Sequence, residues 1–318
     1  MFRSWDQNDR QTVKAANGIL LFTLFIYMGS SFLFEGIDLL LGHQCAILQD
    51  SLVRLVAGQL LLLAPSVCYL IKKRRKITSF LHIRPIRLLS VLACVVFAYA
   101  ISPVIAFCNY MSLQVSDNVI DTTIQDILGH YPLAVAVFCV AFLPCFVEEF
   151  LFRGVLFQSY RKSGFLKAAL LSGLLFGLFH MNLNQMSYAV VAGVLFAALN
   201  EASGSLISSM LVHFIINGTS LISTAVLLQQ PGGMESAEAQ TAEVDLFSMG
   251  CMALIGLVIV VLLLCVIAKI EGRWDDLKEK WRQDLWIRHT KISSPTLIMV
   301  VVVCVIMMAL VQLATMLG

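Results

Sequence analysis

Three ionisable residues, Glu148, Glu149 and Arg153, interrupt an apolar stretch that runs from residue 132 to residue 157. The stretch is long enough to cross a bilayer, which takes about 20 apolar residues. A charged side chain at that depth costs at least about 2.5 kcal/mol, so such residues are usually paired, face a cavity and have a function. These three residues are therefore the first candidates for a functional site.

The spacing of the three residues separates their roles. Glu149 and Arg153 are four residues apart, so they share one face of a helix and can form an ion pair. Glu148 lies about 100° away around the same helix. The spacing predicts that Glu149 is neutralised by Arg153, whereas Glu148 is free to serve as a general base towards another neighbour. A purely structural ion pair between helices is the alternative interpretation.

Two further apolar segments carry isolated polar residues. His180 ends the segment Phe176-Gly177-Leu178-Phe179-His180, and His213 and Asn217 lie four residues apart on one face of a later helix. At 1.5 Å per residue, Glu148 lies about 15 Å, His180 about 20 Å and His213 about 12 Å from the same membrane boundary. One intramembrane histidine alone is usually a hydrogen-bonded packing residue, but the common depth of these residues favours a shared site.

The composition indicates what kind of protein carries this site. Of the 318 residues, 59% are hydrophobic and 13% are charged, and the mean hydropathy is +0.85. These values are typical of a polytopic membrane protein and exclude a soluble one. The polar first 16 residues predict no cleaved signal peptide. The nine cysteines include no CxxC pair, which argues against a zinc knuckle, although a bridge between Cys45 and Cys108 is possible.

We predict an all-α polytopic fold with about eight to nine transmembrane helices that enclose an intramembrane polar cavity. The predicted apolar spans are 17–41, 51–71, 87–110, 132–157, 167–181, 186–201, 205–228, 246–268 and 295–317. Alternate loops contain no Lys or Arg, namely 42–50, 111–131, 182–185 and 229–245, whereas basic residues gather in 72–86, 158–166 and 269–294. This asymmetry predicts a cytoplasmic N-terminus, because Lys and Arg accumulate on the cytoplasmic side.

Several segments outside the spans have simpler interpretations. Residues 181–185 predict a helix break, and the glycine pair Gly173 and Gly177 predicts close helix packing. Residues 235–245 carry four acidic residues and are interpreted as a solvated connection. The segment 269–294 contains Trp274, Trp281 and Trp286, which suits a helix on the inner leaflet or, equally, a solvated linker. Asn200 and Glu201 are placed at the inner boundary without a role.

The three polar motifs resemble those of a known family. Glu148-Glu149-Phe150-Leu151-Phe152-Arg153, Phe176 to His180 and His213 to Asn217 are similar to the EExxxR, FxxxH and HxxxN motifs of the CPBP family, which comprises CAAX prenyl endopeptidases and bacteriocin-processing and self-immunity proteins. The resemblance covers about 130–228. It implies N-terminal membrane helices over 1–129, a catalytic core over 130–228 and a C-terminal helix pair with the Trp-rich segment over 229–318.

The resemblance also implies a chemistry. An intramembrane protease of this kind would use Glu148 and His180 to activate water, and His213 and Asn217 to donate hydrogen bonds to the oxyanion. Glu149, held by Arg153, would orient its neighbour. The substrate would be a membrane-associated protein, a prenylated C-terminus or a leader peptide, and the location the plasma membrane of a bacterium. No nucleic acid is expected as a partner.

Two alternatives remain open at this point. The same polar cluster could belong to a transporter, or to an immunity or regulatory protein that has lost proteolysis. A metal is the second open question, since His180, His213 and a carboxylate could supply three zinc ligands. Glu149 is committed to Arg153 by its spacing, and the HExxH pattern of zinc metalloproteases is absent. We therefore favour a mechanism without a metal or other cofactor.

Overall fold

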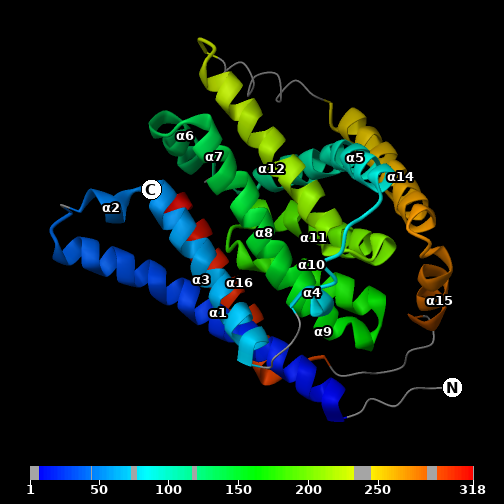
Figure 1. The fold of residues 1–318 in the computed structure, drawn as a ribbon. Coiled ribbons are helices and arrows are strands. Elements are labelled where there is room, and N and C mark those ends of the chain that lie inside the picture. Colours follow the sequence, from blue (N-terminus) through cyan, green and yellow to red (C-terminus); the bar gives the residue numbers. More distant parts are fainter. Residues whose placement is uncertain are drawn as a thin grey trace.

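The computed structural model describes residues 7–43, 45–72, 77–116, 120–232, 245–284 and 292–317. Within these ranges the regular structure is helical, and eight helices are long and apolar enough to cross a membrane (Figure 1). They are α1 (Gln7–Leu40), α3 (Ser51–Lys72), α5 (Leu88–Leu113), a composite helix over 133–160, α11 (Leu183–Ser203), α12 (Leu206–Leu228), α14 (Leu246–Ile270) and α16 (Pro295–Leu317). Shorter helices are α2 (Ala46–Gln49), α4 (Ile77–Phe80), α6 (Ile120–His130), η3 (Arg161–Ser163), α10 (Phe165–Phe179) and α15 (Trp274–Asp284).

The helices confirm the predicted fold class. Each of the nine predicted apolar segments contains a helix, and the ends agree to within three residues except at α1, which begins at Gln7 instead of residue 17. The ninth segment is α10, which has 15 residues and is therefore about 22 Å long. That length falls short of the hydrocarbon core of about 30 Å, so α10 is too short to cross the core alone.

The composite helix carries the glutamates and departs from regular α geometry. It consists of α7 (Leu133–Ala136), the π-helix η1 (Val137–Phe142), α8 (Leu143–Glu149), the π-helix η2 (Phe150–Phe157) and α9 (Gln158–Tyr160). Pro144 follows η1 closely, and its missing N–H leaves one turn without its regular hydrogen bond, which favours the wider π turn. The second π segment begins directly after Glu149, so the site lies at a change of helical pitch.

The antiparallel neighbours α10 and α11 pack with their backbones in close contact. A Cβ atom on Gly173 would lie 2.8 Å from the backbone nitrogen of Val194, and one on Gly177 would lie 2.9 Å from the carbonyl oxygen of Met186. No larger residue fits at either position unless the helices separate. The two glycines therefore mark helix packing, as the sequence predicted.

The turn between α10 and α11 is fixed by asparagines. Asn182 precedes α11 and its Oδ1 accepts a hydrogen bond from the backbone N–H of Gln185 at 3.1 Å. Asn184 is buried and donates to Asn109 Oδ1 of α5 at 3.0 Å. The predicted helix break is confirmed over residues 180–182, whereas 183–185 already form the first turn of α11. Its asparagines satisfy backbone and side-chain groups there.

The two C-terminal membrane helices lie on opposite sides of the bundle. Helix α14 packs along α5, whereas α16 packs along α1 (Figure 1). Between them in sequence, α15 crosses the end of the bundle and contacts α10 and α11. The Trp-rich segment is therefore helical over Trp274–Asp284, and Trp281 is 54% exposed. Although α14 and α16 are consecutive membrane helices, they pack against opposite sides of the bundle.

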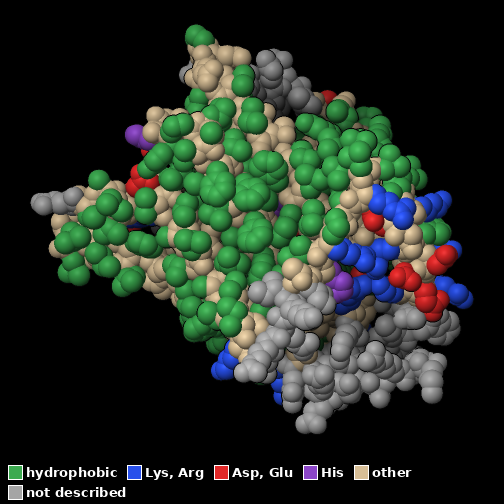
Figure 2. Space-filling model, in the orientation of Figure 1, with side chains coloured by type: hydrophobic (Ala, Val, Ile, Leu, Met, Phe, Trp, Pro, Cys, Tyr) green, Lys and Arg blue, Asp and Glu red, His purple; other side chains and the backbone are tan. Residues whose placement is uncertain are grey.

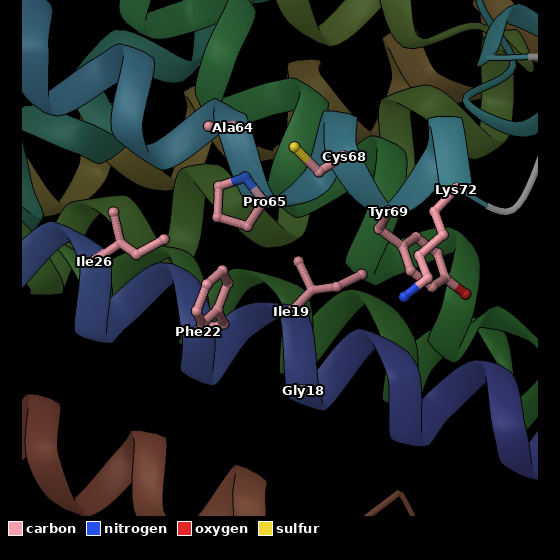
Figure 3. Close-up of a pocket in the computed structure, with 9 residues that line it drawn as sticks. All are labelled: Gly18, Ile19, Phe22, Ile26, Ala64, Pro65, Cys68, Tyr69 and Lys72. Atoms are coloured by element: carbon pink, nitrogen blue, oxygen red, sulfur yellow. The ribbon is translucent and has the colours of Figure 1, made fainter.

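The surface has the character of a membrane protein. Hydrophobic side chains cover most of the visible face, and charged side chains gather mainly on its right side (Figure 2). A groove of about 380 Å³ between α1 and α3 is almost wholly apolar, with Phe22 and Pro65 along its walls and Lys72 at one end (Figure 3). All nine cysteines are free, so Cys45 and Cys108 form no bridge. The basic run at 73–76, Glu235, Glu238, Glu243 and Trp286 lie outside the described residues.

Candidate active site

The centre of the site is a fully buried ion pair. Arg153 Nη1 lies 2.9 Å from Glu149 Oε1, and both side chains are 0% exposed. The same carboxylate oxygen lies 3.1 Å from Nδ1 of His213, which α12 brings from another membrane span. The predicted pairing of Glu149 with Arg153 is present, and His213 completes a buried triad.

Aromatic rings and a glycine make room for the guanidinium. The guanidinium carbon of Arg153 lies 4.1 Å from the ring centroid of Phe176 and 5.3 Å from that of Phe196. Each ring face attracts a cation, by about 2 kcal/mol or more where water is excluded. A Cβ on Gly193 would lie 2.7 Å from Arg153 Nη2. Glycine at this position of α11 therefore provides the space that the arginine occupies.

Glu148 occupies a different environment from Glu149. Its side chain is 15% exposed, and its Oε2 lies 3.8 Å from His213 Nε2, which is too long for a direct hydrogen bond. Its Oε1 accepts a hydrogen bond of 3.4 Å from Gln59 Nε2 of α3. His213 therefore faces Glu149 with one ring nitrogen and Glu148 with the other. The free carboxylate predicted from the spacing is the one that remains partly accessible.

Gln59 is a site residue that the motif analysis missed. It is the single amide within the apolar segment 51–71, and the structure shows that its side chain contacts Glu148 across 89 residues of sequence. An isolated amide in a membrane span was the signal that could have identified it, because polar side chains there usually have a partner.

His180 lies at the C-terminal end of α10, beside the triad but not bonded to it. Its Nδ1 is 2.8 Å from the carbonyl oxygen of Phe176, which assigns a proton to Nδ1 and leaves Nε2 as the free acceptor. The Phe176 ring lies 4.9 Å from the His180 ring and 5.8 Å from the His213 ring, measured between centroids. One aromatic side chain thus separates the two histidines.

Asn217 lies one helical turn beyond His213 on α12 and is half-buried. Within the described ranges its side chain makes no hydrogen bond. The structure therefore brings Glu148, Glu149, Arg153 and His213 together, whereas within the described ranges neither His180 nor Asn217 makes a hydrogen bond or ion pair with Glu148.

The donor set does not match a metal site. Among the residues that the structure describes, no three His, Cys, Asp or Glu side chains are arranged as metal ligands. His213 has both ring nitrogens directed at carboxylates, and Glu149 is held by Arg153. The zinc set of His180, His213 and a carboxylate is not assembled in this geometry, and independence from metal stays a prediction.

The sequence match agrees with this geometry. Residues 130–219 match the family described as type II CAAX prenyl endopeptidase Rce1-like. The chain carries a CAAX prenyl endopeptidase domain. All six residues of the three polar motifs fall inside the matched range, which occupies the composite helix and α10 to α12. No curated protein and no solved structure matches the chain.

The match of residues 130–219 to the CAAX endopeptidase family implies an intramembrane protease domain that acts on proteins or peptides. The CAAX domain contributes the glutamates, the arginine and both histidines. Helix α3, which supplies Gln59, precedes the matched range, so part of the surroundings of Glu148 comes from outside the CAAX domain.

Proposed function

We propose that this protein is an intramembrane endopeptidase in which Glu148 accepts the proton of the attacking water. The observation that carries the proposal is the position of His213, which lies between a buried, neutralised carboxylate and a partly exposed one. Glu148 is the only glutamate of the pair whose side chain is accessible, at 15% against 0% for Glu149. A positioned base of this kind contributes about 10²- to 10⁴-fold to the rate.

Glu149 and Arg153 would hold His213 in the orientation in which it can donate a hydrogen bond to the oxyanion. Glu148, Glu149 and Arg153 carry a net charge of −1, and a proton on both nitrogens of His213 makes the four side chains neutral together. In that state Nδ1–H donates to Glu149, and Nε2–H is available to a developing oxyanion beside Glu148. Preorganised donors in a water-poor site supply much of the stabilisation of such a transition state. Asn217, one turn along the same helix, would be the second donor.

His180 would act with Glu148 in binding and activating the attacking water. Its Nδ1 is held by the Phe176 carbonyl oxygen, so the free Nε2 is presented as an acceptor in a fixed orientation. A bound water between Nε2 of His180 and Glu148 would have two acceptors for its protons. No nucleophilic side chain is required, and the nearby Cys145 is buried with its thiol donating to the carbonyl oxygen of Phe142.

The proposed substrate is a peptide segment at the membrane, either the prenylated C-terminus of a protein or a leader peptide, and the proposed location is a bacterial plasma membrane. A cytoplasmic N-terminus is supported by the basic residues in alternate loops. Single cysteines at Gln114 and Lys278 in a cysteine-free chain test the orientation. We expect Gln114→Cys to react with an impermeant thiol reagent from outside and Lys278→Cys only after permeabilisation, and the reverse pattern would refute it.

A comparison of membrane peptides tests the function. Membranes with the wild-type protein and with Glu148→Gln are compared by mass spectrometry of peptide termini. We expect a set of termini present only with the wild type. Identical termini, together with a phenotype that Glu148→Gln leaves intact, would favour an immunity or regulatory role for the same fold.

A chelator experiment tests metal independence. Purified protein is treated exhaustively with a zinc chelator and assayed on a cleavable peptide while bound metal is measured. We expect cleavage to continue at an unchanged rate. Stoichiometric zinc whose removal stops cleavage and whose return restores it would overturn the proposal.

A further inference from the structure

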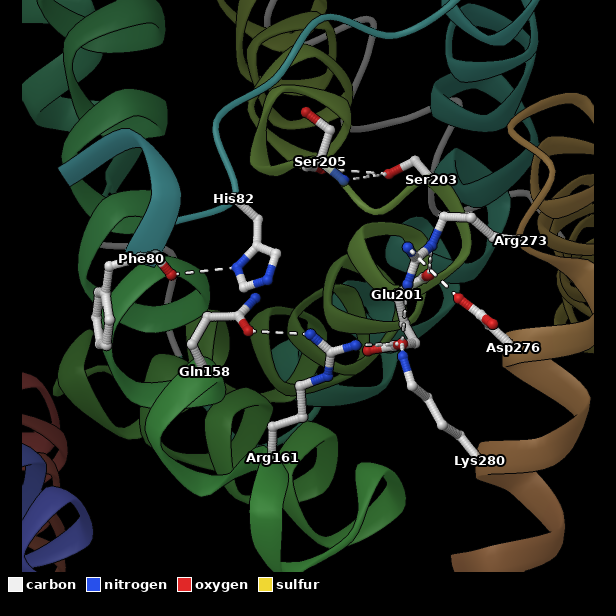
Figure 4. A network of polar contacts seen from close by, with 10 residues as sticks. All are labelled: Phe80, His82, Gln158, Arg161, Glu201, Ser203, Ser205, Arg273, Asp276 and Lys280. Carbon is white, nitrogen blue, oxygen red and sulfur yellow. Dashed lines mark hydrogen bonds and ion pairs between the residues drawn. The ribbon is translucent and has the colours of Figure 1, made fainter. Parts of the chain in front are cut away.

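A second cluster of charged side chains, which shares no residue with the catalytic cluster, surrounds Glu201 (Figure 4). Glu201 ends α11 with a side chain that is 1% exposed, and its Oε1 lies 2.6 Å from Arg161 Nη2 and 3.5 Å from Arg273 Nη2. Lys280 of α15 donates to the same oxygen. Three basic side chains, one from η3 and two from the segment that begins at Arg273 and continues into α15, therefore share one carboxylate.

The cluster lies at one boundary of the membrane. Candidate spans end at Tyr160, Ser203 and Ile270, and Arg161, Glu201 and Arg273 each lie within three residues of one of those ends. Arg84 precedes the span that begins at Leu88. The side chains are therefore placed at the level where lipid headgroups begin.

Gly204 brings a fourth basic side chain into the cluster. It adopts the left-handed conformation, with φ +69°, at the C-terminal cap of α11. A Cβ at this position would overlap Arg84 Nη2 and lie 2.8 Å from Arg273 Nε. Two guanidinium groups thus converge on the one residue that has no side chain. Within the described ranges, the exposed Arg84 guanidinium makes no ion pair with any carboxylate.

The cluster carries an excess of positive charge. It contains four cations, Arg84, Arg161, Arg273 and Lys280, and two anions, Glu201 and the exposed Asp276, which lies 3.9 Å from Arg273. Burial and the adjacent Arg161 guanidinium hold the pKa of His82, which lies beside the cluster, below its usual range. The site is therefore electropositive as well as partly open, with the three cations around Glu201 17–32% exposed.

We propose that Arg84, Arg161, Arg273 and Lys280 form a binding site for a phosphate group, supplied by the headgroup of an anionic lipid. Guanidinium groups bind phosphate oxygens through paired hydrogen bonds, and basic pockets between membrane helices are typical sites for phosphorylated headgroups. Glu201 positions three of the cations, while Arg84 offers a guanidinium that forms no ion pair with a carboxylate in the part of the chain that the structure describes. The bound phosphate would join α15 to the loop before α5.

Thermal unfolding in lipid nanodiscs tests the proposal. The wild-type protein is compared in phosphatidylcholine discs and in discs with increasing phosphatidylglycerol, and we expect the anionic lipid to raise the unfolding midpoint. Arg84→Gln removes a basic side chain without breaking any ion pair in the structure, so it should fold normally and need about tenfold more anionic lipid for the same shift. Arg282→Gln is the matched control. It removes an equal charge from the C-terminal turn of α15, where the Arg282 side chain is 79% exposed.

Inorganic phosphate and glycerol phosphate, added to phosphatidylcholine discs, distinguish the two sources of the group. A stabilisation by phosphatidylglycerol alone identifies the lipid, and an equal stabilisation by free phosphate assigns the site to a soluble phosphoester. In either case a titration followed by NMR should show the His82 pKa rising when the anion binds. Equal responses of Arg84→Gln and Arg282→Gln, or no shift with any phosphate compound, would overturn the proposal.

Discussion

Two buried glutamates in this protein have opposite surroundings. Glu149 has one arginine, Arg153, four residues away on its own helix, His213 from α12, and a second carboxylate next to it in sequence. Glu201 has three cations, the nearest of which in sequence is Arg161, 40 residues away. The first cluster leaves an accessible carboxylate and the second leaves accessible cations. In the functions proposed above, the accessible group of each cluster, more than its buried pair, would determine the chemistry of that region.

The largest effect should come from the surplus carboxylate. Glu148→Gln keeps the size of the side chain and can still accept a hydrogen bond from Gln59, but it cannot take a proton from water. We expect kcat for peptide cleavage to fall by about 10²- to 10⁴-fold, with an unchanged unfolding midpoint. Glu148→Ala and His180→Ala should also abolish cleavage in a folded protein. Retained activity in Glu148→Ala, with a stable but inactive Arg153→Ala, would reverse the assigned roles.

The next effect concerns the buried pair itself. Arg153→Ala leaves Glu149 buried without its partner, which costs about 3–5 kcal/mol. We expect a large fall in the amount of folded protein extracted from membranes. The double variant Glu149→Gln with Arg153→Met removes both charges and serves as the control. It should recover part of the lost stability, and a double variant no more stable than Arg153→Ala would show that the ion pair is not the cause.

The corresponding change in the second cluster should be milder. Glu201→Gln leaves cations that are 17–32% exposed and that water can solvate, so we expect a loss of about 1–3 kcal/mol. Unfolding of the purified protein in denaturant measures it. A loss as large as that of Arg153→Ala would mean that the two clusters do not differ in accessibility, and the comparison would fail.

The smallest effect is expected at Gln59. Gln59→Leu removes the 3.4 Å hydrogen bond to Glu148, a contact worth about 1.5–3 kcal/mol at most because one partner is charged. We expect kcat for peptide cleavage to fall by about tenfold, with little change in KM. Gln114→Leu on the exposed end of α5 is the control for a lost amide. Equal activity in the two variants would place Gln59 outside the site.

The sequence predicted what depends on spacing within a helix. The Glu149–Arg153 pair, the break at 181–185 and the close packing at Gly173 and Gly177 follow from a helical period that packing does not change. The limits of the apolar segments followed from composition. These features account for the helices and for the order of the motifs along them.

Contacts between distant segments could not be predicted. Gln59 reaches Glu148 across 89 residues. Glu201 was assigned no role because its partners lie 40 to 79 residues away, in η3 and in the segment of α15. The placement of α14 and α16 on opposite sides could not be predicted either. Each is a uniformly apolar helix, and its pattern does not indicate which helix it packs against. Such contacts depend on how helices pack side by side, which a local period does not specify.

The positions of the cations along the chain set an order of events during synthesis. Lys280 follows Glu201 by 79 residues, so a ribosome that adds 5–20 residues per second delivers it about 4–16 s later. During that interval Glu201 has Arg161 alone, and α15 docks only after α14 has entered the membrane. We expect a nascent chain arrested before Arg273 to be digested by protease more readily at 201–205 than the released protein. The C-terminal helices would thus stabilise the bundle last, after the proteolytic core has been inserted into the membrane.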